Sequence, residues 1–109
     1  MKTSELSGAE LDMWVAKAEE KLAWISSNGK VYTEEGWYSP STDWSQGGPL
    51  IQREFVTIYP ETYTSGDLWF ASPFSGTESF EGETPLIAAM RCLVASKFGN
   101  EVPDEETKA

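Results

Sequence analysis

The stretch TPLIAAMRCLVASKFGN, residues 84–100, predicts the most deeply buried helix of this protein. Thr84 suits the N-cap position, and Pro85 suits the first helical position, where its missing N–H costs no hydrogen bond. Apolar side chains then occur on nearly all sides until Gly99 and Asn100 end the helix. Such a helix must be covered by a sheet and another helix of the same chain, or by a second copy in a homo-oligomer. The sequence leaves both alternatives open.

An N-terminal helix is expected over residues 8–27. Ser7 and Glu10 have the spacing of a capping box, in which each side chain accepts a hydrogen bond from the other residue's backbone N–H. Apolar residues recur at helical spacing and define one buried face: Leu11, Val15, Ala18, Leu22 and Ile25. The opposite, solvated face is expected to carry Asp12, Glu19 and Glu20. Asn28 and Gly29 are expected to end the helix.

Between these helices the sequence changes to short segments rich in β-branched and aromatic residues. The expected strands cover residues 30–33, 37–39, 50–59 and 67–72, with turns at 34–36, 46–49 and 64–66. Most connections are too short for parallel crossovers. We therefore expect an α+β fold in which an antiparallel sheet of three to five strands carries the N-terminal and C-terminal helices on one face. A single domain is expected over residues 1–100, with an acidic, flexible tail over 101–109.

The composition excludes several kinds of chemistry. The 109 residues carry 8 basic and 18 acidic side chains, a formal net charge of −10, and they include no histidine and one cysteine. Without histidine there is no Ser-His-Asp or Cys-His catalytic set and no imidazole ligand for a metal. A single cysteine forms neither an internal disulfide nor a paired-cysteine metal motif. The negative charge disfavours binding to a nucleic-acid backbone, so we expect a binding protein with no metal and no cofactor.

No membrane or targeting segment is expected. The N-terminus is polar from Lys2 onward, and the longest apolar stretch, residues 86–95, is interrupted by Arg91 and is too short to cross a bilayer. Together with the single thiol, these features favour a soluble protein of a reducing cytoplasm.

Three blocks of sequence run from one end of the chain to the other. They read MKTSELSGAELD with VAKAE (residues 1–12 and 15–19), YSPSTDWSQGGPLI (38–51), and TPLIAAMRC with VASK (84–92 and 94–97). Together they resemble the NinX-like family of small tailed-phage proteins. The resemblance implies a phage accessory gene product, and it assigns no biochemical role.

The middle block concentrates side chains that can hold a small polar ligand. Six hydrogen-bonding residues fall within nine positions and are flanked by two indoles: Tyr38, Ser39, Ser41, Thr42, Asp43 and Gln46, with Trp37 and Trp44. A pocket for a small polar molecule needs a ring for stacking and polar groups that orient the ligand. The alternative is ordinary turn chemistry, in which the short side chains bond to nearby backbone N–H groups and Trp44 fills the core.

The two arginines have different explanations. Arg91 lies in the nearly all-apolar helix, so its charge needs a carboxylate, a group of carbonyl oxygens or the anion of a ligand. An ion pair with Asp43 or another internal acid is favoured, and the ligand anion, which adds Arg91 to the candidate binding residues, is the alternative. Arg53, beside Glu54, is expected on the solvated face of a strand.

Two hypotheses for function follow from these features. In the first, a phage-encoded, non-enzymatic accessory protein counters host defence by sequestering a small polar, nucleotide-like ligand. The middle block also resembles tryptophan- and proline-containing segments of phage proteins that act as nucleotide sponges. In the second, the acidic chain blocks a basic groove of a host nuclease or defence complex, as an inhibitor or DNA mimic, because its charge steers it toward a basic host protein. An enzyme is the least favoured class, because carboxylates alone would have to move every proton. The expected location is the host cell cytoplasm.

Overall fold

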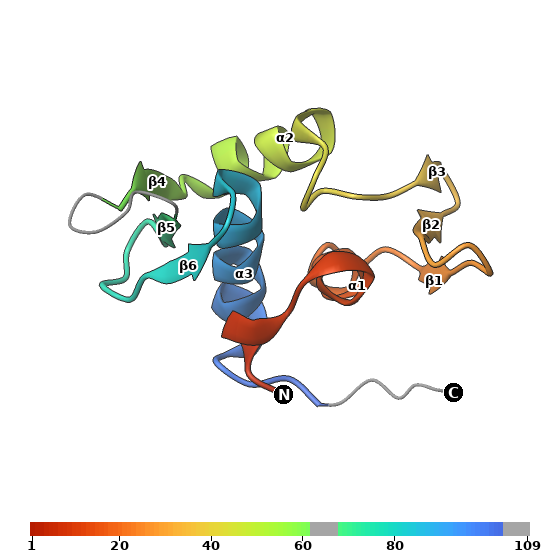
Figure 1. The fold of residues 1–109 in the computed structure, drawn as a ribbon, viewed down its shortest axis with the longest axis horizontal. Helices are drawn as coiled ribbons and strands as arrows, with labels where there is room; N and C mark the ends of the chain where they lie inside the picture. The colour runs from red at the N-terminus through yellow and green to blue at the C-terminus, as the bar shows by residue number, and fades with distance from the viewer. Residues whose placement is uncertain (62–67, 104–109) are drawn as a thin grey trace.

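The fold combines three α-helices with two small sheets in a computed structural model of the chain, whose described residues are 1–61 and 68–103 (Figure 1). The elements follow in the order η1 (Thr3–Glu5), α1 (Gly8–Ala18), β1 (Ala23–Ile25), β2 (Val31–Thr33), β3 (Gly36–Trp37), α2 (Trp44–Glu54), β4 (Thr57–Pro60), β5 (Trp69–Ser72), β6 (Phe80–Gly82) and α3 (Pro85–Phe98). The α+β class predicted from the sequence is confirmed.

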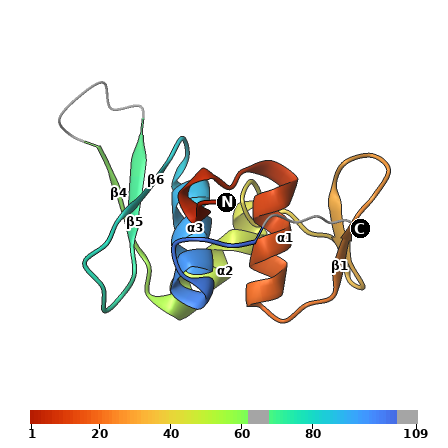
Figure 2. The ribbon, with the colours of Figure 1, turned by 90° about the horizontal axis from the view of Figure 1, so that it is seen from below.

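The strands form two antiparallel sheets, where one sheet of three to five strands was expected. Strands β1, β2 and β3 are neighbours in one sheet, and β4, β5 and β6 are neighbours in the other. Helix α2 separates β3 from β4 in the chain, and helices α1 and α3 lie between the two sheets in space (Figures 1 and 2). The expected strand at 50–59 is therefore half helix and half strand, and β6 was not predicted.

The elements lie in layers along the longest axis of the molecule. In Figures 1 and 2 the order is sheet β4–β5–β6, helix α3, helix α1 and sheet β1–β2–β3, while α2 crosses one end of α3. The principal-axis extents are 41 × 27 × 27 Å. Each helix in the middle of this order is covered on two sides, which explains why both are rich in buried residues.

Helix α3 is the centre of the core, as its sequence predicts. The Thr84 hydroxyl accepts a hydrogen bond from the backbone N–H of Ile87 at 3.1 Å, and Pro85 begins the helix. The helix packs against α1, α2 and all three strands of the second sheet. This packing within one chain accounts for its apolar character on all sides, and Cys92 is fully buried as a core residue.

Helix α1 is shorter than predicted. It ends at Ala18, and Glu20 adopts a left-handed backbone with φ of 60° before the chain turns into β1. Leu22 and Ile25, assigned to the buried helical face by their spacing, are 74% and 53% exposed. Asn28 and Gly29 belong to the turn between β1 and β2, where the N–H of Lys30 bonds to the Asn28 side chain at 3.0 Å.

Helix α1 begins at Gly8 after Ser7 as predicted, but two details of the prediction are wrong. The Ser7 side chain makes no capping hydrogen bond, so the capping box with Glu10 does not form. Asp12, assigned to the solvated face, is only 4% exposed. Its burial follows from the position of α1 between α3 and the first sheet, which leaves little of the helix facing solvent.

The turn predicted at residues 46–49 is part of helix α2. Asp43 caps this helix by accepting the N–H of Ser45 at 3.0 Å, and Pro49 lies inside it. A Cβ at position 47 would lie 2.5 Å from the carbonyl oxygen of Pro40, so glycine is required there by close packing.

The other predicted boundaries differ by smaller amounts. Strands β2, β3 and β5 begin or end within a few residues of the expected ranges, and the predicted turn at 64–66 lies outside the described residues. The tail was expected from residue 101, but Val102 is 3% exposed and its carbonyl accepts the N-terminal ammonium at 2.9 Å. Residues 104–109 are outside the described part of the chain. Within that part, no helix is long and apolar enough to cross a membrane.

Candidate binding site

The site segment, residues 37–43, leaves strand β3 and leads into helix α2. The N–H of Tyr38 donates to the carbonyl of Val31 at 2.9 Å and prolongs the pairing of β3 with β2. The chain then turns, because the N–H groups of Thr42 and Asp43 both donate to the carbonyl of Ser39. The segment therefore runs from a sheet edge into a helix cap within seven residues.

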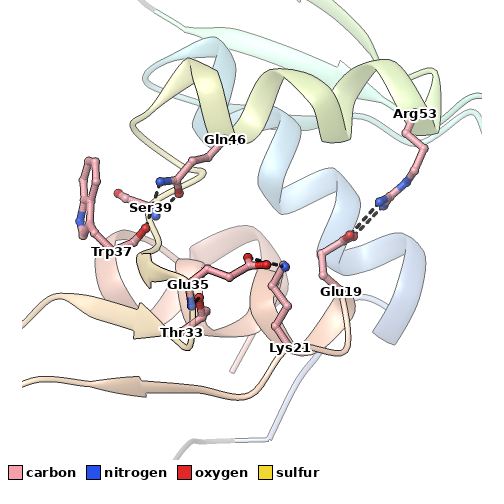
Figure 3. A network of polar contacts seen from close by, with 8 residues as sticks. All are labelled: Glu19, Lys21, Thr33, Glu35, Trp37, Ser39, Gln46 and Arg53. Carbon is pink, nitrogen blue, oxygen red and sulfur yellow. Dashed lines mark hydrogen bonds and ion pairs between the residues drawn. The ribbon is translucent and has the colours of Figure 1, made fainter.

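A glutamine side chain fixes the extended part of the segment. Gln46 donates its amide N–H to the carbonyl of Trp37 at 3.0 Å and accepts the N–H of Ser39 through its amide oxygen. Figure 3 shows this side chain reaching from α2 to the backbone of both residues. The Gln46 amide thus pairs with the N–H of Ser39 and the carbonyl of Trp37 at the free edge of the segment. A neighbouring strand would make the same two kinds of hydrogen bond.

A buried carboxylate holds the turn from the other side. Asp12 of α1 accepts the N–H of Ser41 at 2.9 Å and the hydroxyl of Ser39 at 3.3 Å. The Ser39 and Thr42 hydroxyl oxygens are 2.6 Å apart and share a hydrogen bond. Helix α1 and the site segment are therefore joined by one polar network.

This network borders a hollow of about 180 Å³, which we call the Trp37 hollow. Five of the predicted site residues line it: Trp37, Tyr38, Ser39, Ser41 and Thr42. Asp12 with Gly8 and Ala9 lines it from α1, and Gly29 with Lys30 and Val31 lines it from the turn before β2 and from β2 itself. Trp37 is 46% exposed, so part of this residue is accessible beside the hollow. Three larger hollows, of about 260, 400 and 240 Å³, contain none of the predicted residues.

Four predicted residues do not line the Trp37 hollow. Asp43 and Gln46 are engaged in the helix cap and the backbone clamp described above. Trp44, the first residue of α2, is 54% exposed and does not fill the core.

Arg91, the fourth, lies on α3 and has a different function in the fold. Its Nε donates to the carbonyl of Leu6 at 2.8 Å, and its Nη1 donates to the carbonyl of Glu81 at 2.7 Å. The expected ion pair with Asp43 is therefore wrong, and backbone carbonyls satisfy the guanidinium. They come within reach because α3 packs against both β6 and the η1 turn that precedes Leu6.

Comparison with known proteins identifies the family. The family model described as bacteriophage P22, NinX, matches residues 2–97. The chain belongs to this phage family. No curated protein matches the chain. The family resemblance of the three sequence blocks is thus confirmed over nearly the whole length.

In this NinX-family chain the sequence did not reveal Asp12 and Lys30 as site residues. A signal for Asp12 was present, because Ala9 and Ala16 lie three residues before it and four after it, on the same side of α1. Small residues on both sides of a charge indicate a helix face that is closely covered. No comparable signal identifies Lys30, which reaches the hollow through the turn before β2.

Among the described residues, three ion pairs lie near the network, and Figure 3 shows those of Arg53 with Glu19 and of Lys21 with Glu35. Arg53 of α2 binds both carboxylate oxygens of Glu19 at 2.8 and 2.7 Å and also bonds to Glu54. Lys21 pairs with Glu35 at 3.3 Å. Arg53 was expected on a strand, and it instead ties α2 to the end of α1.

Burial changes the acid–base properties of two residues in the network. It raises the pKa of the Tyr38 phenol, and the charges of Glu19 and Asp12 raise it further. Burial also raises the pKa of the Asp12 carboxyl above its ordinary value of 3.8, although hydrogen bonds from Ser41 and Ser39 oppose the change. Among the described residues, no group of three or more cysteine, aspartate or glutamate side chains is arranged to hold a metal ion.

We expect the stability of Asp12→Asn, relative to the wild type, to increase as the pH rises. The folded wild type binds the Asp12 proton more tightly than the unfolded chain does, so ionisation of Asp12 destabilises the fold. This penalty is absent below pH 3.8 and develops as the pH rises through the raised folded pKa. Urea denaturation over a series of pH values measures the difference, and a difference that decreases with pH would show that the fold stabilises the carboxylate.

Proposed function

We propose that this chain is a non-enzymatic accessory protein that binds a small polar, nucleotide-like ligand at the Trp37 hollow. The observation that carries the proposal is the convergence of five predicted residues with Asp12 around one hollow beside an exposed indole. A ring for stacking and a few fixed polar groups are the features that such sites share.

The polar groups favour a ligand that presents N–H donors. Asp12 accepts two hydrogen bonds within the protein, and a carboxylate has acceptor capacity for about four. An amino or amide edge of a nucleobase supplies such donors, while the Trp37 indole offers its face to the ring. The hollow, at about 180 Å³, suits a single ring better than a whole nucleotide. Lys30, in the same lining, supplies positive charge for a phosphate that extends outside.

Membership of a phage family supports a setting in the infected host. A phage protein that binds a nucleotide-like signal of host defence lowers the free concentration of that signal, even though it catalyses no reaction of it. We therefore propose sequestration in the host cytoplasm as the way in which binding serves the phage.

Thermal unfolding with a panel of linear and cyclic nucleotides tests this proposal. A member present at 100 times its Kd should raise the free energy of unfolding by about 2.7 kcal/mol, which corresponds to roughly 10 °C in Tm. Trp37→Ala should remove this effect, because the stacking surface is lost. Trp44→Ala is the matched control, since Trp44 is similarly exposed, at 54%, but lies outside the hollow. No change in Tm with any nucleotide, or equal changes in both variants, would contradict the proposal.

A further inference from the structure

The first sheet carries a row of three aromatic side chains on one face. Trp24 is paired with Tyr32 across β1 and β2, and Tyr32 is paired with Trp37 across β2 and β3. Directly paired residues point to the same side of a sheet, so the three rings share one face, which we call the aromatic face. The alternate residues Val31 and Thr33 are buried and point to the opposite face.

The aromatic face is open to solvent. Trp24 and Trp37 are 47% and 46% exposed. Helix α1 packs against β1 and β2, and Figures 1 and 2 show this sheet at one end of the long axis with α1 on its inner side. Two half-exposed indoles on one face are unusual on a protein that functions alone, and they are typical of an interaction surface.

A second feature lies at the turn between β2 and β3, at one end of the sheet that carries the aromatic face. A hollow of about 240 Å³ is lined there by three glutamates, Glu20, Glu34 and Glu35, and by Lys21. Leu22 and Thr33 complete its lining. Lys21 pairs with the exposed Glu35, so the remaining charge of this acidic hollow is negative. Leu22, which lines the acidic hollow, is 74% exposed and lies two residues before Trp24 in the chain.

The negative charge beside the aromatic face indicates which kind of partner can bind there. A single-stranded nucleic acid stacks on aromatic rows but needs a cationic groove, and here the adjacent groups are carboxylates in a chain of net charge −10. A second copy in a symmetric dimer brings the same carboxylates toward each other. Arginine side chains satisfy both features, because a guanidinium stacks on an indole and pairs with carboxylates.

We propose that the aromatic face and the acidic hollow together bind an arginine-containing segment of another protein. This inference goes beyond the proposed ligand site, because Trp24 and the acidic hollow belong to a different part of the surface. Trp37 is the one residue that borders both.

A fluorescein-labelled peptide of alternating arginine and serine is the probe for this surface. Fluorescence anisotropy at low salt should show binding that weakens as salt is added. Trp24→Ala should weaken binding about threefold or more, and Glu34→Gln should weaken it at low salt. Trp24→Phe keeps a ring and should retain part of the affinity. Trp44→Ala and Glu5→Gln, at exposed positions outside the surface, should bind as the wild type does.

Several outcomes would overturn the inference. One is that the arginine peptide does not bind the wild type, and another is that it binds Trp24→Ala as tightly as the wild type. An oligouridylate that binds more tightly than the peptide, in a way that depends on Trp24, would also contradict the inference. So would self-association of the wild type that Trp24→Ala abolishes. Thermal unfolding of each variant shows that it is folded. Because Trp24→Ala leaves the Trp37 hollow intact, loss of peptide binding is distinguishable from loss of nucleotide binding.

Discussion

Replacement of Gly47 by alanine should lower the free energy of unfolding by about 2–3 kcal/mol. An added Cβ would lie 2.5 Å from the carbonyl oxygen of Pro40 and 2.7 Å from a side-chain carbon of Leu86. Because the first neighbour is backbone, relief requires movement of the site segment or of α2. Denaturation by guanidinium chloride measures the loss.

Gly48 provides the matched control for this change. A Cβ there meets only the Trp44 ring, at 3.9 Å, and the position lies within α2. Gly48→Ala should therefore leave stability equal or raise it by up to about 1 kcal/mol, because alanine favours helix. Equal losses in the two variants would show that general helix properties, and not the contact with Pro40, determine the effect.

Arg91→Met should lower the free energy of unfolding by about 2–3 kcal/mol. Methionine keeps the apolar packing of the arginine stem but removes the two hydrogen bonds to the carbonyls of Leu6 and Glu81. These bonds connect α3 with the segment before α1 and with β6. Chemical denaturation gives the loss, and Arg91→Lys should show an intermediate value, since a lysine ammonium lacks the fork that reaches both carbonyls.

The ligand-anion alternative for Arg91 makes the opposite prediction. An arginine kept for a ligand should leave stability almost unchanged when it is replaced, and nucleotide binding should be lost. That result would contradict the structural explanation of Arg91.

The sequence predicts elements well where local signals and packing agree. Helix α3 has a cap at Thr84, a proline at its start and apolar residues that the core buries over most of its length, from Leu86 to Val94. Helix α1 was extended too far because Leu22 and Ile25 continue the helical spacing. The decisive signal was Asn28-Gly29 between two β-forming stretches, which favours a hairpin turn over a helix end.

Helix α2 could not be predicted because its sequence opposes helix formation locally. Gly47, Gly48 and Pro49 are poor helix formers, so the residues predict a turn. Tertiary contacts outweigh this tendency, since α2 packs on α3 and its Gly47 fits against Pro40. A single sequence does not show which backbone will approach a glycine.

The candidate site was predictable in the part that is contiguous in the chain. The run of polar and aromatic residues from Trp37 to Thr42 predicts a binding site from the sequence alone. Asp12 is far from this run in the chain, and only the tertiary fold brings it to the hollow. Arg91 was grouped with them because a charge on an apolar helix needs a partner, and backbone carbonyls give no signal in a sequence. The ordinary turn chemistry expected as an alternative is present at Asp43, whose carboxylate accepts the backbone N–H of Ser45.

A titration of the isotope-labelled protein with nucleotides, followed by backbone-amide NMR, tests the central claim most directly. The claim is that a small polar ligand binds at the Trp37 hollow. Saturable changes in resonance position should centre on the amides of Gly29, Lys30, Ser39 and Ser41, and they should be absent in Trp37→Ala. Changes centred on another surface, or no saturable change with any nucleotide, would contradict it.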